Sequence, residues 1–141
     1  MANEYKIAWV QNRLGLGQPL IDEQHQRLIE LANAVLEGML TGKPPQDMAQ
    51  AVGRLLQYAR SHFEFEESLM SRYGFPDRKR HAADHRRQLD QLQGMLDGLD
   101  QSSPATLEYV AAFLHDWVEL HIRSEDRELA SYLKNRDQKP E

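Results

Sequence analysis

Apolar residues recur every three or four positions in four stretches of the chain, and clusters of glycine and proline separate these stretches. That spacing is typical of an α-helix with one buried face. The four helices are expected to begin near residues 19–22, 45, 77 and 104, and the first to end near Leu40. The predicted inward positions are Leu28, Ile29, Ala32, Val35, Leu36 and Met39 in the first stretch, Val52, Leu55, Leu56, Ala59 and Leu69 or Met70 in the second, Leu89, Leu92, Met95 or Leu96 and Leu99 in the third, and Leu107, Val110, Ala111, Leu114, Trp117 and Val118 in the fourth.

The connections between these helices are short and carry turn residues. They cover residues 41–45, 73–77 and 100–104. Gly74 is expected to cap the end of the second helix, and Ser103 the start of the fourth. Because short connections join antiparallel neighbours, the pattern predicts an all-α fold, an up-down-up-down antiparallel four-helix bundle.

The length of 141 residues and the mass of 16.4 kDa suit a single domain that buries one core. We expect an extended N-terminal arm over residues 1–18, the bundle over 19–136 and a frayed tail over 137–141. The arm carries Trp9, which is expected to pack against the core of the bundle.

Composition narrows the classes of partner. The formal net charge of -5 and the pI near 5.7 leave no broad basic surface, which argues against nucleic acid and anionic membranes as partners. Cysteine is absent, so any metal must be held by nitrogen and oxygen. The N-terminus lacks a basic start followed by an apolar core, and no run approaches ~18 apolar residues, so we expect a cytoplasmic protein.

Five of the six histidines fall into one ordered series with two carboxylates, and partners within a helix lie four or five residues apart, a spacing at which two side chains can reach the same metal region. They are His25, His62 and Glu66, His81 and His85, and His121 and Asp126. They fall near the starts of the first and third helices and near the ends of the second and fourth. In an antiparallel bundle these four places lie at one level, so the series predicts a two-metal site in the bundle interior.

Helical spacing from His121 distinguishes His115, Glu125 and Asp126. His115 precedes His121 by six residues, which turns it about 240° around a regular helix and away from the site. Asp126 follows His121 by five residues, a rotation of about 140°, whereas Glu125 has the simpler four-residue spacing. Spacing alone therefore favours Glu125 over Asp126 as a partner of His121.

The segments IDEQHQRLIELAN, HFEFEESLM, RYGFPDRKRHAADH and WVELHIRSED resemble the corresponding blocks of the bacterial hemerythrins, and the similarity covers nearly the whole chain. The resemblance implies a four-helix bundle with a non-heme di-iron centre that binds dioxygen reversibly. It also implies that Asp126, and not Glu125, is the metal ligand, which would leave the Glu125 side chain in solvent.

The resemblance further implies a ligand set. His81, His85 and His121 would bind one iron, His25 and His62 the other, and Glu66 and Asp126 would bridge both, together with an oxo or hydroxo group. The first iron then has six ligands and the second five, which leaves one open position for dioxygen. Leu28, Trp117 and Ile122 are candidates for an apolar wall around that position.

The expected function is reversible dioxygen binding by a carrier or store that is not an enzyme. An oxygen or redox sensor that acts through a separate protein partner is one alternative. A di-iron enzyme that handles peroxide or nitric oxide, with weak oxidase or peroxidase activity, is another. Because imidazole also suits zinc, copper and nickel, a bundle that holds one of these metals stays open.

Overall fold

The computed structural model describes residues 6–9, 14–97 and 104–138. Three of the four predicted helices are single α-helices, and the fourth is three consecutive helical segments. The elements are α2 (Pro19–Leu40), α3 (Pro45–Arg72), α4 (Arg78–Asp97), α5 (Pro104–Leu120), the π-helix η2 (His121–Asp126) and α6 (Arg127–Gln138). The starts near 19, 45, 77 and 104 are confirmed, whereas the break at His121 was not expected.

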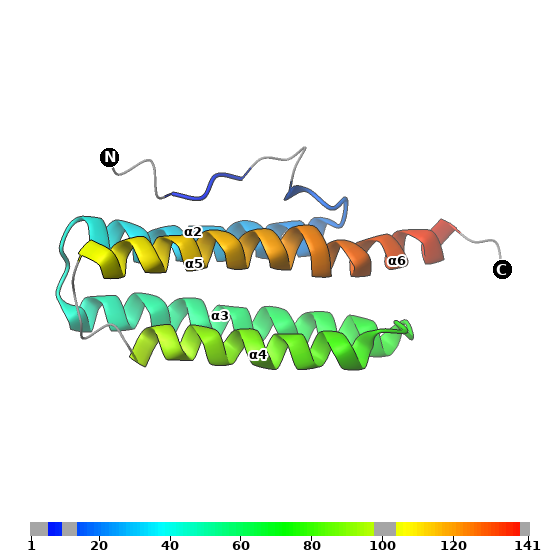
Figure 1. Cartoon of the computed structure of the whole chain (residues 1–141). Coiled ribbons are helices and arrows are strands. Elements are labelled where there is room, and N and C mark those ends of the chain that lie inside the picture. Colours follow the sequence, from blue (N-terminus) through cyan, green and yellow to red (C-terminus); the bar gives the residue numbers. More distant parts are fainter. Residues whose placement is uncertain (1–5, 10–13, 98–103, 139–141) are drawn as a thin grey trace.

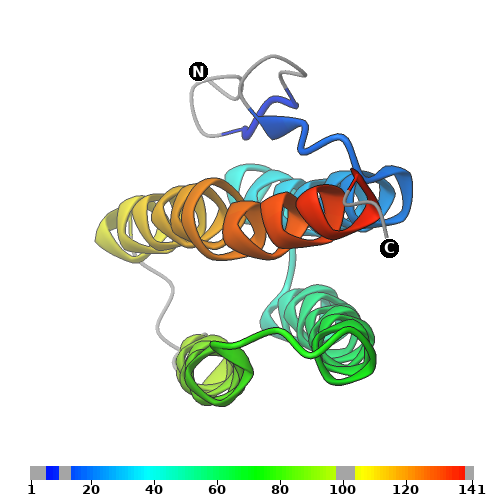
Figure 2. The same cartoon turned by 90° about the vertical axis from the view of Figure 1, so that its right-hand side faces the viewer.

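The helices alternate in direction and form two layers. In Figure 1, α2 and α4 run one way along the bundle, and α3 and the α5–η2–α6 rod run the other. Figure 2 shows α2 beside the rod in one layer and α3 beside α4 in the other. The predicted up-down-up-down antiparallel bundle is confirmed. Among the described residues, no helix is long and apolar enough to cross a membrane.

The turn after α3 sets where α4 starts. Gly74 takes a positive φ of 66°, and the Phe75 N–H donates to the Met70 carbonyl at 2.9 Å, which is the closing bond of a Schellman cap. Phe75 and Met70 are both buried in one apolar cluster. The predicted glycine cap is confirmed here, whereas Ser103 lies outside the described residues.

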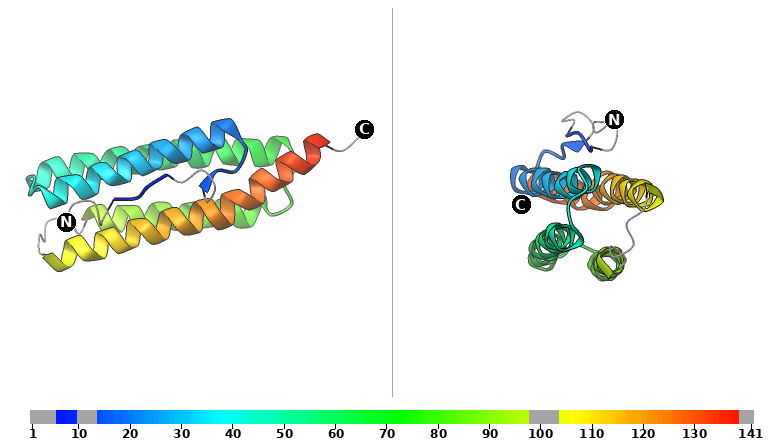
Figure 3. Two further views of the ribbon diagram at one scale, coloured as in Figure 1. Left: turned by 90° about the horizontal axis from the view of Figure 1, so that it is seen from above. Right: turned by 90° about the vertical axis from the view of Figure 1, so that its left-hand side faces the viewer.

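The described parts of the N-terminal arm, residues 6–9 and 14–18, lie over the α2 and α5 layer (Figure 3). Ile7 and Asn33 of α2 exchange two hydrogen bonds: the Ile7 N–H donates to Asn33 Oδ1 at 2.7 Å, and Asn33 Nδ2 donates to the Ile7 carbonyl at 2.8 Å. Ile7 and Leu14 are buried, and Trp9 packs against the same core while partly exposed. The arm therefore covers one face of the bundle, as the position of Trp9 indicated.

The core consists of two apolar clusters with a polar layer between them. All the predicted inward positions with a described side chain are buried or partly buried; Leu96, Leu99 and Leu107 have none. The larger cluster fills most of the bundle. The smaller one occupies the end near the α3–α4 turn and contains Ile21, Met70, Phe75, Leu129 and Leu133 as its buried members. Along the chain, each set of predicted metal ligands lies between residues of the two clusters; for α4 the residue of the smaller cluster is Phe75, in the turn before the helix.

Candidate metal centre

The structure brings all seven predicted residues together in the polar layer. Each of them is at most 1% exposed. Their donor atoms form two groups, within each of which the atoms lie at most 4.8 Å apart. The first group is His25, His62, Glu66, His121 and Asp126, and the second is His81, His85 and Asp126. Asp126 belongs to both groups, so the two form one continuous cluster.

The π-helix explains how both of its acids, Glu125 and Asp126, reach His121. A π-turn contains one more residue than an α-turn, so a residue five positions on returns to the same face. Asp126 Oδ2 accordingly lies 2.8 Å from His121 Nε2. Glu125 Oε2 lies 3.6 Å from Nδ1 of the same ring. Both acids are therefore neighbours of His121, because Asp126 contacts Nε2 and Glu125 lies near Nδ1.

The expectation that Glu125 lies in solvent is wrong. Its side chain is 11% exposed, and Oε2 accepts a hydrogen bond of 2.6 Å from Gln88 Nε2. Gln88 is 5% exposed, and its Oε1 accepts a hydrogen bond of 2.7 Å from the Trp117 indole N–H. That expectation came from the resemblance, which gives the ligand role to Asp126; the π-turn brings Asp126 to His121 Nε2 while Glu125 stays beside Nδ1 of the same ring.

Both buried carboxylates lie between the two histidine groups. Glu66 Oε1 is 3.4 Å from His62 Nε2 and 3.3 Å from His85 Nε2. Asp126 Oδ2 is 3.1 Å from His62 Nε2, while its Oδ1 is 3.9 Å from His81 Nε2. Each carboxylate can therefore reach a cation held by either group.

The donor atoms of the cluster suit metal cations. Several buried atoms have no hydrogen-bond partner: His25 Nδ1, both Glu66 oxygens, His81 Nε2, His85 Nε2, His121 Nδ1 and Asp126 Oδ1. His62 Nε2 and His121 Nε2 face each other at 2.9 Å. No lysine or arginine is buried among the described residues, so imidazoles are the only basic groups there beside the two carboxylates. Divalent cations among these atoms would pair with the Glu66 oxygens, Asp126 Oδ1, His81 Nε2 and His85 Nε2, and would offset the charge of the carboxylates.

The pKa values reflect this crowding of groups in the bundle interior. Burial, and then the nearby Asp126 carboxylate, raise the pKa of Glu66 well above its ordinary value. Burial would also raise the pKa of Asp126, but His121, His25 and His62 hold it well below its ordinary range. Burial lowers the pKa of His62 to about 4. For His121 burial is outweighed by Asp126 and Glu125, and its pKa rises to about 9.

Two further histidines have acceptors on the nitrogen that faces away from the cluster. His62 Nδ1 donates to Gln24 Oε1 at 2.7 Å, and His85 Nδ1 lies 3.0 Å from Glu67 Oε2. An N–H at Nδ1 leaves the Nε2 lone pair free to face the cluster. Sequence reasoning missed Gln24 and Glu67, because each is an immediate neighbour of a predicted ligand and helical spacing carries no signal for such a pair.

Aromatic rings fix the planes of two imidazoles. Phe63 stacks on His85 with centroids 4.0 Å apart and an interplanar angle of 7°. Trp117 stacks on His121 with corresponding values of 5.9 Å and 9°. The ring planes are therefore set by packing as well as by hydrogen bonds.

His115 and the predicted wall residues lie outside the two donor groups. His115 is half-buried and belongs to neither donor group, in agreement with its predicted helical phase. The wall candidates Leu28, Trp117 and Ile122 are buried in the larger apolar cluster. Their role toward dioxygen stays a prediction.

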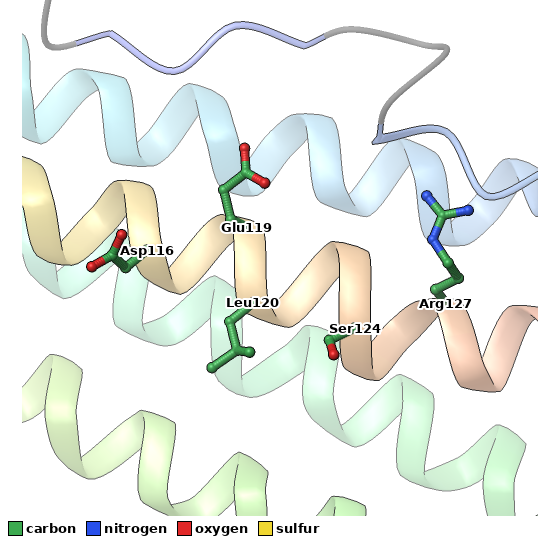
Figure 4. A pocket seen from close by; sticks show the side chains of 5 residues that line it. All are labelled: Asp116, Glu119, Leu120, Ser124 and Arg127. Carbon is green, nitrogen blue, oxygen red and sulfur yellow. The ribbon is translucent and has the colours of Figure 1, made fainter.

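Two hollows open on the surface of the rod. One, of about 710 Å³, contains none of the predicted ligands (Figure 4); its lining is Asp116, Glu119, Leu120, Ser124 and Arg127. The other, of about 210 Å³, lies between α4 and α5 and reaches His121; its lining is Arg87, Gln88, Gln91, Phe113, Asp116, Trp117, Leu120 and His121. Only the second hollow approaches the cluster, and it does so from behind His121.

Residues 16–133 match the family described as the hemerythrin HHE cation binding domain. A bacteriohemerythrin of Stenotrophomonas maltophilia is 30% identical over 132 residues, which cover 91% of this chain and 82% of that protein. A bacteriohemerythrin of Methylococcus capsulatus is 26% identical over 125 residues, which cover 86% and 92%. A crystal structure of wild-type hemerythrin matches with a TM-score of 0.75 at 21% identity, over 86% of this chain and 92% of that one, a likeness of fold.

Proposed function

Because this chain belongs to the hemerythrin family, whose domain is described as cation binding, we propose that it binds dioxygen reversibly at a di-iron centre, as a carrier or store. The family and the cluster together support a metal centre. Iron as the metal and dioxygen as the ligand come with the family resemblance. The observation that carries the proposal is that each of two buried carboxylates contacts both groups of histidines.

The proposed ligand set keeps the division implied by the resemblance. His81, His85 and His121 would bind one iron, His25 and His62 the other, and Glu66 and Asp126 would bridge them. The contacts of the two carboxylates support the bridging role. The assignment of His121 to the same iron as His81 and His85 rests on the resemblance, since its Nε2 lies 2.9 Å from His62 Nε2 in the metal-free arrangement.

The chain itself would contribute geometry and the exclusion of water. Gln24 and Glu67 hold the outer nitrogens of His62 and His85, so the opposite nitrogens keep their lone pairs for the metal. Leu28 and Ile122 are each 1% exposed and would keep water from the open coordination position. When bound, a di-iron centre with one open position would supply electrons to dioxygen and recover them on release.

The composition of the cluster favours binding over catalysis. It has five imidazoles and two carboxylates, whereas the ferritin-like di-iron proteins use a carboxylate-rich set with two Glu-x-x-His motifs. Fewer anionic ligands stabilise highly oxidised iron less well, so the site is better suited to reversible reduction of its ligand than to oxidation of a substrate. The cytoplasmic location and the absence of a nucleic-acid or membrane partner stay predictions.

The test uses the full chain produced with adequate iron. We expect about two irons per chain, a visible spectrum that changes when dioxygen is added to the anaerobically reduced protein, and recovery of the first spectrum on degassing. Azide added to the oxidised protein should give new charge-transfer bands, because the proposed ligand set would leave one iron with an open position. The control is His115→Ala, which should behave as the unaltered chain.

Two results would contradict the proposal. Zinc as the only metal in protein made with adequate iron would overturn the di-iron centre. Dioxygen that is consumed with turnover, and not recovered on degassing, would replace binding by an enzymatic activity.

A further inference from the structure

A network of contacts lies behind His121, on the side away from the predicted metal ligands. Trp117 donates its indole N–H to Gln88 Oε1 at 2.7 Å, and Gln88 donates from Nε2 to Glu125 Oε2 at 2.6 Å. The same Glu125 oxygen lies 3.6 Å from His121 Nδ1, and the Trp117 ring stacks on the His121 ring. The four residues come from α4, α5 and η2, so the network connects three elements around one imidazole.

His121 Nδ1 is the polar atom of this network that lacks a hydrogen bond. The atom is buried and has no hydrogen-bond partner, although the Glu125 oxygen at 3.6 Å lies within a few tenths of an ångström of hydrogen-bond reach. The opposite nitrogen, Nε2, lies 2.8 Å from Asp126 Oδ2. A metal that takes the Nε2 lone pair requires the ring proton to sit on Nδ1, where Glu125 is the nearest acceptor.

Gln88 holds Glu125 in this place and helps to keep water out. The 210 Å³ hollow between α4 and α5 is lined by Gln88, Trp117 and His121, so solvent approaches the ring from this side. The Gln88–Trp117 hydrogen bond lies at the boundary between that hollow and the buried ring. Without it, water could take the place of Glu125 at Nδ1, and a water molecule is a weaker acceptor than a carboxylate.

We propose that Glu125 and Gln88 are positioning residues for His121: Glu125 accepts the Nδ1–H, and Gln88 fixes Glu125 against Trp117. The Nδ1–H of the ring then points at Glu125, its lone pair points at the metal, and the nearby negative charge strengthens the imidazole as a donor. The inference rests on the proposed metal centre, but it does not depend on whether the ligand is dioxygen.

Metal affinity tests the proposal without any dioxygen chemistry. Metal-free chains carrying Glu125→Gln, Gln88→Leu or both changes would be titrated with Co²⁺ against a competing chelator. Each single change should weaken binding about 10-fold to 100-fold, the usual loss when a ligand's outer partner is removed. The matched control is Glu64→Gln on α3, an exposed carboxylate that should leave the affinity unchanged.

The double variant separates positioning from general packing. If Gln88 acts through Glu125, the double change should weaken binding no more than the worse single change. Losses that add in full would mean that the two residues act independently, and would overturn the proposed relay. Equal affinity of all variants would overturn the positioning role altogether.

Nitrogen NMR of the Zn²⁺-loaded chain supplies a readout that packing alone would not move. The His121 Nδ1–H resonance should lie far downfield and shift upfield in Glu125→Gln, while the His85 resonance stays in place because its acceptor is Glu67. An unchanged His121 resonance would overturn the proposal. A chain that binds neither Co²⁺ nor Zn²⁺ would instead contradict the metal centre itself, so the two failures are distinguishable.

Discussion

Deleting Ser124 should convert the π-helix into a regular α-helix and leave the bundle intact. Ser124 is exposed and lies between His121 and Asp126. Without it, Asp126 follows His121 by four steps, which returns it to within about 40° of the same direction on a regular helix. The buried residues of α6 keep their phase, because they follow Asp126 and move with it. We expect the melting temperature to change by only a few degrees.

Inserting an alanine after Ser124 is the matched opposite change. In a helix that otherwise stays regular, one extra residue turns α6 by about 100° relative to α5. Leu129 and Leu133, which are 0% and 7% exposed, would then leave the smaller cluster. At about 2–3 kcal/mol for each leucine, the loss is about 4–6 kcal/mol, a large part of the stability of a small domain. The melting temperature should fall by about 10–20 °C.

Far-ultraviolet circular dichroism during heating would measure both variants, and iron analysis would measure their metal content. The deletion variant should keep its iron but hold it more weakly, because Glu125 then stands three positions from His121 and loses its contact with Nδ1. Equal destabilisation by the deletion and the insertion would refute the reasoning, since it would mean that the π-turn is not a single added residue in an otherwise continuous helix.

Three further predictions concern single groups. Asp126→Asn should weaken iron binding more than about 100-fold, beyond the loss expected when only an outer partner is removed, because it removes a bridging charge. Iron analysis would show the loss, and full retention of iron would contradict the prediction. His121→Ala should lose iron whereas His115→Ala should keep it, and equal losses would disprove the assigned helical phase. In the metal-free chain, His62 has a pKa of about 4 against an ordinary 6.5, so the unfolded state binds more protons between these values. That contribution, about 3 kcal/mol, is complete above pH ~6.5 and lost as the pH falls to ~4. Because the raised pKa of Glu66 acts in the opposite sense in part of this range, denaturant titrations at several pH values would compare the chain with His62→Gln, and an equal pH dependence of the two would refute the prediction.

Most of the fold was predictable because it follows from spacing and turn chemistry. The helix starts near Pro19, Pro45 and Pro104 coincide with prolines at positions where a first helical turn tolerates them. The glycine cap at Gly74 was predictable for the same local reason. The bundle topology then follows from the short connections, which leave few ways to pack four amphipathic helices.

The π-helix was not predicted, although the sequence carries a trace of it. The inward positions of α5, such as Leu114, Val118 and His121, continue on a regular helix to Glu125 and Tyr132. The buried positions in α6 are instead Leu129, Ala130 and Leu133, one residue out of phase. A shift of one residue between two apolar stripes is the mark of a single-residue insertion. It is easily missed where the stripes meet at charged and polar residues.

The convergence of the seven predicted ligands was predictable from spacing and level, but their outer partners were not. Gln88 and Glu67 contact the cluster from another helix, at distances in sequence that reflect tertiary packing alone. Spacing along one helix carries no information about such pairs. Glu125 was considered, but only as a rival of Asp126 for the metal, because a regular helix leaves room for one of the two.

The division of the core into two unequal clusters has a kinetic consequence. The seven residues between the clusters are at most 1% exposed, so a metal ion cannot reach them while the bundle is closed. Local opening costs least where the fewest apolar side chains must separate, which is at the end closed by Ile21, Phe75 and Leu133. A metal ion is therefore expected to enter the site, and to leave it for a chelator, at the rate at which this end opens and not at the rate of diffusion.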